Sequence, residues 1–340
     1  MDKFRIWIRR FEDLSFTRLF NTIKGVQNQK KVPGLLILID MVLCYLILGT
    51  GYLDYYNFGF VNTPWKKRRT FMTMVENVEL CRKLDDSEKK MLFEDKISFL
   101  KTFSKYIGRE WLDLRESGEE GFAAFVKKHP VFFAKELDGS GGKGVKKIKT
   151  DASTDIPALY AELCGKKMWL TEEPIRQHYE MNRLCPDSIN TIRMTTILKD
   201  GVPHLMYSLV RIGAGGTEVD NVSSGGYHAI LDDDGIIRGK AHHEKSFSLA
   251  EKHPMTGTIF NGFAVPRFSD AKKMVLEAAE VVPEVRYVGW DVAISEDGPV
   301  FVEGNTLPGY DMCQNYCKVG SDRTGIKPLF KEVLGEEFPD

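Results

Sequence analysis

The sequence has no excess of charge of either sign. Its 340 residues include 47 Lys and Arg and 48 Asp and Glu, which gives a formal net charge of −1. Because nonspecific binding to nucleic acid depends on a basic electrostatic field, this balance gives no reason to expect DNA or RNA as a partner. We therefore expect a globular protein whose specificity resides in a defined site.

The cysteines lack the spacing of a disulfide framework or of a zinc site with two CxxC pairs. Cys313 and Cys317 are four residues apart and would share one face of a helix, but no second pair accompanies them. We expect structural thiols in a reducing cytoplasm, with a metal at this pair as the alternative. The six cysteines are Cys44, Cys81, Cys164, Cys185, Cys313 and Cys317.

A long uninterrupted apolar run and a cleavable signal pattern are also missing. The run "GLLILIDMVLCYLILGT", residues 34–50, is shorter than the roughly 20 residues of a membrane span and contains Asp40, so we expect a buried helix. The preceding residues 1–33 interleave basic and aromatic side chains. They predict either an amphipathic helix on the anionic inner leaflet or a terminal helix packed on the protein.

The spacing of apolar residues changes between residues 120 and 130. Up to about residue 120, apolar residues recur at spacings of three and four, which indicates helices. From about residue 130, short β-rich runs alternate with turns, and one helix lies around "SDAKKMVLEAAEVVP". We expect a helical N-terminal part before an α+β body. The predicted divisions are residues 1–33, 34–120, 121–175 and 176–340.

The segment "VFFAKELDGSGGKGVKKIKT" contains the strongest local signal. It satisfies GxGxxG formally, but "VKKIKT" alternates as a strand where a dinucleotide-binding turn would open a helix, and Lys143 is not followed by the Ser or Thr of a Walker A loop. The remaining interpretation is a hairpin whose backbone amides bind phosphates, with Lys135 as a nearby cation. An ordinary flexible hairpin with a surface lysine is the alternative. The loop residues are Gly139, Ser140, Gly141, Gly142 and Gly144.

A second hairpin, "YVGWDVAISEDGPVFVEGN", places oxygen donors among apolar residues. The apolar faces of its two strands coincide if residues 296–298 form a three-residue loop. Asp291 then lies opposite Glu303, and Asn305 follows on the same face. Oxygen-only donors favour Mg²⁺ held together with nucleotide phosphates. Two solvent-facing acids on an edge hairpin are the alternative.

These motifs, in this order, resemble the ATP-grasp superfamily. The segments "EEPIRQH", "SINTIRMTT", "VDNVSSGGYHAILDDDG", "HPMTG" and "VGWDVAISEDGPVFVEGN" resemble more closely the sugar-transfer-associated ATP-grasp proteins, which are predicted to serve cell-surface polysaccharide synthesis. The resemblance covers roughly residues 35–315. It implies an ATP-grasp fold, in which two α+β subdomains hold ATP, here preceded by a helical region where many ligases have an α/β domain.

The resemblance implies roles for individual residues. Lys135 and Lys96 correspond to phosphate-binding lysines, and Asp291, Glu303 and Asn305 correspond to the magnesium ligands. The segment "TEEPI" corresponds to the strand that holds adenine, and Glu180 has the spacing of a ribose-binding acid, although "QHYEMN" departs from the usual local pattern. The adenine-strand residues are Glu172, Glu173 and Ile175.

The acceptor side follows from the same resemblance. Arg193 corresponds to the arginine near the transferred phosphate, and Arg211 and Asn221 flank the acceptor. Salt bridges within the sheet are the alternative for both arginines, since an unpaired charge in an apolar strand is costly. His178, Asn190 and His253 lie in family-like motifs and are further substrate-binding candidates.

The segment "GKAHHEKSF" suggests a metal through His242, His243 and Glu244, but we expect these residues to be solvated in a polar loop.

The resulting functional hypothesis is a carboxylate-amine ligase that uses Mg²⁺ and ATP. A uronic acid on a glycan precursor would be the carboxylate, and an amino acid or amino sugar the amine. The alternatives are a kinase that phosphorylates a sugar hydroxyl at the same site, and a nucleotide-binding scaffold without turnover. Contact with the inner membrane leaflet is a further hypothesis, based on the basic N-terminal segment.

Overall fold

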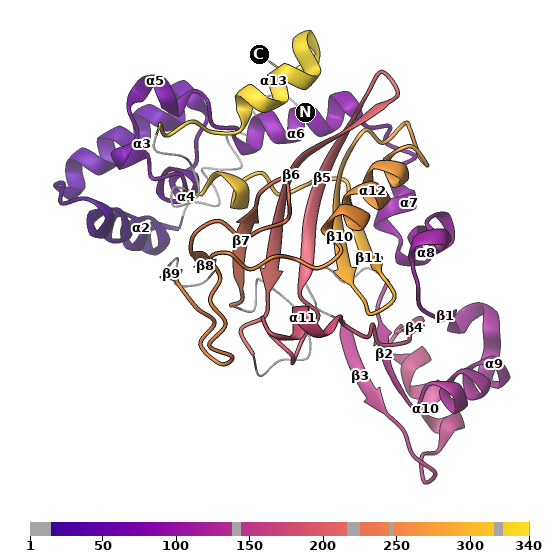
Figure 1. The fold of residues 1–340 in the computed structure, drawn as a ribbon. Helices are drawn as coiled ribbons and strands as arrows, with labels where there is room; N and C mark the ends of the chain where they lie inside the picture. The colour runs from indigo at the N-terminus through magenta and orange to yellow at the C-terminus, as the bar shows by residue number, and fades with distance from the viewer. Residues whose placement is uncertain (1–14, 138–143, 216–224, 245–247, 316–321, 340) are drawn as a thin grey trace. The chain divides into compact units, whose positions relative to one another are not determined.

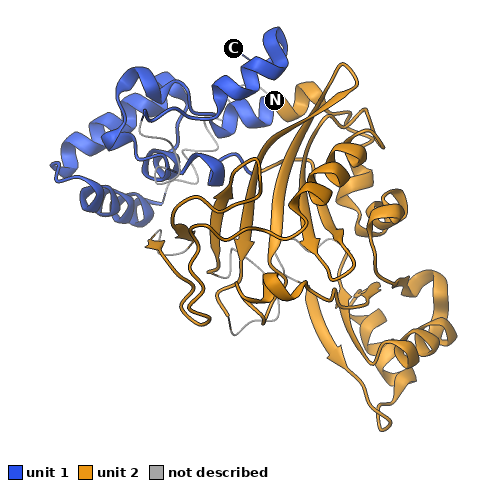
Figure 2. Ribbon diagram, viewed as in Figure 1, with its two compact units in different colours: residues 1–79, 309–340 blue, residues 80–308 orange. Residues whose placement is uncertain are grey.

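The computed structural model describes residues 15–137, 144–215, 225–244, 248–315 and 322–339. The chain divides into two compact units (Figure 2), and each is described separately below. Unit 1 comprises Met1–Glu79 and Gly309–Asp340, and unit 2 comprises Leu80–Pro308. The C-terminal segment therefore belongs to the same unit as the N-terminal helices, although the two are far apart in the sequence.

The regular elements in the described part of unit 1 are all helices, joined by turns and loops (Figure 1). The N-terminal helix α2 begins after Ser15, whose hydroxyl accepts a hydrogen bond from the Arg18 amide and so caps the helix. Its helices are α2 Phe16–Gln29, α3 Gly34–Leu48, α4 Tyr52–Asn57, η1 Phe60–Asn62, α5 Trp65–Arg68, η4 Met312–Gln314, α13 Lys327–Leu334 and η5 Gly335–Glu337, together with the first residues of α6 Met74–Leu84.

The expectation that residues 34–50 form a helix is confirmed by α3, but the expectation that this helix is buried is wrong. Only Ile37, Met41 and Cys44 of α3 are buried. Asp40 is accommodated at the packed side of the helix, where it forms an ion pair with Arg68 at 2.7 Å and accepts a hydrogen bond from the Tyr55 hydroxyl at 2.6 Å. The other side is exposed by 43–68% and consists of Leu35, Leu36, Ile39, Val42, Leu43, Leu46 and Ile47.

No single helix among the described residues is long and apolar enough to cross a membrane. Taken together, α2 and α3 are long and apolar enough to cross one, judged by length and composition alone, and the pair is bent by 108°.

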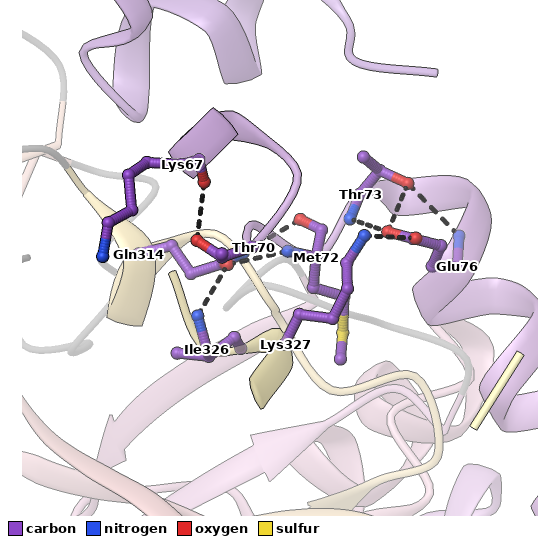
Figure 3. Close-up of polar contacts among 8 residues, drawn as sticks. All are labelled: Lys67, Thr70, Met72, Thr73, Glu76, Gln314, Ile326 and Lys327. Atoms are coloured by element: carbon purple, nitrogen blue, oxygen red, sulfur yellow. Dashed lines mark hydrogen bonds and ion pairs between the residues drawn. The ribbon is translucent and has the colours of Figure 1, made fainter. Parts of the chain in front are cut away.

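Polar contacts join the two sequence segments of unit 1 (Figure 3). The Gln314 side chain accepts hydrogen bonds from the backbone amides of Met72 and Ile326, and its amide nitrogen donates to the Met72 carbonyl. Lys327 forms an ion pair with Glu76 at 2.5 Å. Since Gln314 is fully buried, these bonds satisfy backbone groups that would otherwise be costly to bury.

Unit 2 begins with helices and a four-stranded antiparallel sheet of order β1-β4-β2-β3. The prediction that the glycine loop connects two strands is confirmed, because β2 and β3 are antiparallel partners. Helices α9 and α10 pack on this sheet through Phe122, Phe125 and Leu163. The elements are α7 Met91–Glu94, α8 Lys96–Thr102, η2 Ser104–Tyr106, β1 Trp111–Asp113, α9 Leu114–Lys128, β2 Val131–Lys135, β3 Val145–Lys149, α10 Ile156–Gly165 and β4 Leu170–Glu172.

A seven-stranded antiparallel sheet follows, with the order β11-β10-β5-β6-β7-β8-β9. Helix α12 packs against β5, β6, β10 and β11, and apolar side chains fill the space between them. The elements are α11 Tyr179–Asn182, β5 Thr191–Lys199, β6 Val202–Ile212, β7 Tyr227–Leu231, β8 Ala241–His243, β9 Leu249–Ala250, α12 Phe268–Ala279, β10 Tyr287–Ile294 and β11 Pro299–Asn305.

The hairpin of β10 and β11 has the predicted register at its functional end but a different turn. Asp291 lies opposite Glu303, as expected. The predicted three-residue loop is wrong: Ile294 pairs with Pro299, so four residues form the turn. A β-bulge at Val302 adds one residue to β11 and restores the register before Glu303.

Candidate functional site

A cavity of about 350 Å³ lies between elements of unit 2. Its volume is within the range of small-molecule sites, roughly 300–1,000 Å³. Helices α7 and α8, strands β2 and β4, and the end of β11 form its walls. It contains five of the residues that the sequence predicted for nucleotide and metal binding: Lys96, Lys135, Glu172, Glu303 and Asn305.

Two lysines bring positive charge to this cavity from different elements. Lys96 is the first residue of α8 and donates a hydrogen bond to the Leu137 carbonyl at 2.8 Å. Lys135 is the last residue of β2 and forms an ion pair with Glu172. Leu137 also lines the cavity and lies two residues before Gly139, so the Lys96 ammonium lies next to the residues that lead into the glycine-rich segment.

Glu172 is a buried carboxylate held by two cations. Lys135 contacts one of its oxygens, and Arg109 contacts the other at 2.8 Å. Burial alone would raise the pKa of Glu172, but the charges of Arg109 and Lys135 outweigh it and lower the pKa to about 2. Arg109 also donates to the Phe301 carbonyl at 2.6 Å, which connects β4 to β11. Nothing in the local sequence around Arg109 indicated this role.

Gly304 stands between Glu303 and Asn305, and aromatic rings pack directly against its backbone. A Cβ at this position would lie 2.7 Å from Phe99 and 2.9 Å from Phe93, both of which line the cavity. The glycine therefore lets the rings approach the strand that carries the two oxygen donors.

Asp291 is buried, is not among the residues that line the cavity, and accepts hydrogen bonds from two arginines. Arg193 contacts both carboxylate oxygens, at 2.5 and 2.9 Å, and Arg211 contacts one at 3.0 Å. Burial would raise the pKa of Asp291, but Arg193 and Arg211 outweigh it and lower the pKa to about 2. Both arginines are thus paired within the sheet.

Glu303 and Asn305 line the cavity and both carry side-chain oxygen atoms. Burial raises the pKa of Glu303, and the neighbouring Asp291 carboxylate raises it further. Two carboxylates this close favour a shared proton or a bound cation. The Asn305 amide nitrogen donates to the Gly289 carbonyl at 3.4 Å, so its carbonyl oxygen is the atom available to a cation.

Strand register places the polar residues in one row on the face of the large sheet opposite α12. Glu303 pairs with Asp291, and Asp291 with Arg193. Two residues earlier on β5, Thr191 pairs with Arg211, which in turn pairs with His228 on β7. Directly paired residues of antiparallel strands share a face, so the row extends from β11 to β7.

Among the residues that the structure describes, the other predicted site residues do not line this cavity. Glu173 and Ile175 follow β4, and Glu180 forms an ion pair with Arg183. His178 caps α11 by accepting a hydrogen bond from the Glu180 amide. Two candidates are completely buried and hydrogen-bonded to the backbone: Asn190 contacts the Met181 and Cys185 carbonyls, and His253 contacts the Gly213 carbonyl.

Several predicted residues lie outside the described part of the chain. These are Gly139, Ser140, Gly141, Gly142 and Asn221, as well as Cys317 of the predicted cysteine pair. Gly144 is described: it has a φ of +71°, and its carbonyl accepts a hydrogen bond from the Glu136 amide at the base of the hairpin.

The expectation that the histidines of "GKAHHEKSF" are solvated is wrong. His242 is 2% exposed and lies on β8 directly opposite His228, which is 1% exposed. A carboxylate oxygen of Glu244 contacts the Nδ1 atom of His228. No local pattern in the sequence indicated His228, which is 14 positions before His242 in the chain.

The sequence profile of the family described as sugar-transfer-associated ATP-grasp matches residues 75–321. The matched segment carries the described residues of the cavity and of the polar row, and it covers more than half of the chain. The chain belongs to this family. A search of curated proteins finds no significant match.

Solved structures with the ATP-grasp fold are similar to the chain at low identity. The ATP-grasp ligase PsnB, bound to its precursor peptide PsnA2 and AMPPNP, is 12% identical, with a TM-score of 0.43; the match covers 75% of this chain and 62% of PsnB. D-alanyl-alanine synthetase A from Vibrio cholerae is 12% identical, with a TM-score of 0.42 and coverage of 73% and 66%. The chain thus spans just under two thirds of both proteins.

A third structure gives similar values. D-Alanine–D-alanine ligase from Bacillus anthracis is 14% identical, with a TM-score of 0.41 and coverage of 72% of this chain and 67% of the ligase. Sequence identities and TM-scores this low do not support assigning the activities of these proteins to this member of the sugar-transfer-associated ATP-grasp family. Its function is argued from its own residues.

Proposed function

We propose that this protein is an ATP-dependent ligase that joins a carboxylate to an amine through an acyl phosphate. The observation that carries the proposal is the cavity that gathers Lys96, Lys135, Glu303 and Asn305 in a chain of the ATP-grasp family. Cationic side chains on one side and oxygen donors on the other suit a nucleotide triphosphate bound with magnesium.

The reaction has two steps. In the first, a carboxylate oxygen of the acceptor attacks the γ-phosphorus of ATP, the bond to the β-phosphate oxygen breaks, and ADP leaves. In the second, the amine nitrogen attacks the acyl carbon, the bond to the phosphate oxygen breaks, and the amine loses a proton. The products are an amide, ADP and phosphate.

The residues have distinct roles in this proposal. Lys96 and Lys135 bind the phosphates and, with the backbone amides of the glycine loop, compensate their charge. Glu172 holds the Lys135 ammonium through their ion pair. Arg193 and Arg211 stabilise the negative charge that develops on the transferred phosphoryl group. The remaining nucleotide candidates are Gly139, Ser140, Gly141, Gly142, Gly144, Glu173, Ile175 and Glu180, and the remaining acceptor candidates are His178, Asn190, Asn221 and His253.

The residues present fit a magnesium ion. Glu303 and Asn305 face the cavity, and Asp291 contacts Glu303 from the neighbouring strand, so the donor set consists of oxygen atoms only. Burial and the Asp291 charge raise the pKa of Glu303, and a cation bound at the cavity would offset both effects. Glu303 and Asn305, with Asp291 beside them, would hold the magnesium ion, which would supply electrostatic polarisation of the phosphates for transfer.

The proposed acceptor is a uronic acid on a nucleotide-linked or lipid-linked glycan precursor of a cell-surface polysaccharide, such as a capsule. The amine would be an amino acid or an amino sugar. The family's description as sugar-transfer-associated supports this substrate class.

The test combines the purified full-length chain, Mg-ATP and a panel of uronic-acid glycans with amino acids and amino sugars. We expect mass spectrometry to detect an amide product together with ADP and phosphate. Glu303→Gln should abolish product formation, because it removes a charged oxygen donor. Glu296→Gln in the exposed turn of the same hairpin is the control and should keep full activity. Equal activity of both variants would contradict a catalytic site at this cavity.

A sugar kinase that uses the same site is the alternative. Transfer of the γ-phosphoryl group to a hydroxyl requires the same lysines and the same magnesium ligands. A product that gains only a phosphate, without incorporation of an amine, would support the kinase over the ligase.

We also propose that the protein works in the cytoplasm with the α2–α3 pair on the anionic inner leaflet. Seven large apolar side chains of α3 are exposed, and Asp40, which lies among them in the sequence, is paired with Arg68. On α2, Phe16 and Phe20 are 81% and 58% exposed, and Lys24 lies over the Phe20 ring at 4.6 Å. Exposed apolar side chains next to basic ones are typical of helices that lie in a membrane interface.

Sedimentation with vesicles tests the membrane proposal. The full-length chain should sediment with vesicles that contain anionic lipid, and the double variant Leu35→Ser, Leu46→Ser should remain in the supernatant. Ile259→Ser is the matched control, because Ile259 is 66% exposed and lies in unit 2. If the double variant binds as strongly as the control, α3 is not the membrane-binding surface.

We also propose that the domains of the chain are divided after residues 33, 120 and 175. In the structure the small sheet already begins with β1 at Trp111. Limited proteolysis would locate the boundaries experimentally.

A further inference from the structure

Three potential metal ligands of unit 2 converge away from the nucleotide cavity. His228 lies on β7, His242 lies opposite it on β8, and Glu244 follows two residues later. One ligand atom from each residue lies within 4.8 Å of the others. We propose that His228, His242 and Glu244 form a binding site for a divalent transition metal such as Zn²⁺.

Strand geometry explains why the three side chains share a face. His228 and His242 are directly paired, so their side chains lie on the same side of the sheet. The Glu244 amide donates to the Gly226 carbonyl at 3.1 Å, which continues the ladder beyond β8. Residues two apart along a strand point to the same side, and Glu244 therefore joins His242. The neighbouring His243 pairs with Tyr227 and faces the other side.

The donor set is that of a transition metal rather than of magnesium. Imidazole nitrogen favours zinc, copper, iron and nickel, whereas magnesium prefers oxygen. Two histidines and one glutamate also make up known zinc sites that keep a position for a water or a substrate. Metal–ligand bonds of about 2.0–2.2 Å place ligand atoms at most about 4.4 Å apart, so small side-chain rotations would complete the site.

Burial makes the site rigid but leaves it accessible. The side chain of His228 is 2% exposed, and that of Glu244 is 23% exposed, so an ion would enter beside Glu244. His228 also pairs across the sheet with Arg211, which forms an ion pair with Asp291. The proposed site thus lies in the same polar row as the magnesium ligands, three strands away from Asp291. It does not depend on the proposed ligase activity.

The test measures metal binding to the full-length chain with excess Mg²⁺ present to saturate the oxygen site. We expect one equivalent of Zn²⁺ by titration calorimetry, and a Co²⁺ absorption spectrum typical of nitrogen and oxygen ligands in a site of low coordination number. Glu244→Gln and His242→Gln should each weaken binding by about tenfold or more. Glu244→Gln provides the safer comparison, because this side chain is the most exposed of the three.

Two control variants separate this site from others. His243→Gln changes a histidine on the opposite face, and Glu303→Gln changes the magnesium site; both should bind Zn²⁺ and Co²⁺ as the unchanged chain does. The proposal is overturned if no Zn²⁺ binds, if Glu244→Gln and His242→Gln bind as strongly as the unchanged chain, or if Glu303→Gln removes the bound metal.

Discussion

Replacement of Glu172 by glutamine tests the electrostatic argument for the cavity. Glutamine keeps the shape and can still accept a hydrogen bond, but Arg109 and Lys135 then lose their shared negative partner. The two cations lower the pKa of Glu172 from 4.5 to about 2. At about 1.4 kcal/mol for each pKa unit, this shift corresponds to roughly 3 kcal/mol. We expect the free energy of unfolding to fall by about 3–5 kcal/mol, since the loss of one partner leaves buried charge uncompensated.

The measurement is urea unfolding followed by circular dichroism at several pH values. A carboxylate with a lowered pKa contributes stability above its ordinary pKa, and this contribution is lost as the pH falls toward the folded-state value. The difference in stability between the unchanged chain and Glu172→Gln should therefore be full at neutral pH and should narrow as the pH falls from about 4.5 toward about 2.

A matched control is available on the surface of the same unit. Glu162 also contacts two lysines, Lys146 at 3.2 Å and Lys166 at 2.7 Å, but its side chain is 41% exposed. Because exposed ion pairs contribute little, Glu162→Gln should leave the urea midpoint nearly unchanged. Equal losses for the two variants, or a Glu172→Gln loss that does not change with pH, would refute the assignment of Glu172 as a buried, charge-compensated carboxylate.

Two further predictions concern stability. Burial raises the pKa of Asp85 from 3.8 to about 6, so the folded state holds this proton more tightly than the unfolded state and stability should fall as the pH rises from about 4 to about 6. Asp85→Asn removes this titration, so between pH 4 and 6 the variant should lose up to roughly 3 kcal/mol less stability than the unchanged chain; the same pH dependence in both would contradict the raised pKa. Gly304→Ala places a Cβ against Phe99 and Phe93 and should reduce stability by about 1–3 kcal/mol in thermal unfolding. Gly165→Ala, at a position with open space and no positive φ, should cause no loss, and a similar loss in both variants would argue against the packing explanation.

The sequence predicted which residues of the β10–β11 hairpin face each other at its functional end, but not the length of its turn. Alternation of apolar residues was enough to place Asp291 opposite Glu303. It was not enough to identify the turn, because a four-residue turn with an extra residue at Val302 gives the same pairing as a three-residue turn without a bulge. The pairing beyond the bulge depends on the turn length and on the bulge together. A local residue pattern therefore cannot distinguish a three-residue turn without a bulge from a four-residue turn with one.

Contacts between distant segments were not predictable in the same way. Arg109 and Glu172 are 63 positions apart, and each looks like an ordinary surface charge in its own segment. The exposed face of α3 was missed for a related reason. A run of apolar residues predicts burial, but only the tertiary structure shows which side of the helix the rest of unit 1 covers.

The apolar face of the large sheet determines where the polar row lies. Trp290 and Val292 point toward the core with α12, and the Trp290 indole donates to Thr196 at 2.9 Å. Asp291, between them, must then point to the opposite face, toward Arg193. A shift of β10 by one residue would bury Asp291 among apolar side chains and expose Trp290, at a cost of several kcal/mol. The packing of residues that touch no ligand therefore fixes which strands present carboxylates and arginines to one another, and core substitutions on β10 should alter the site as well as the stability.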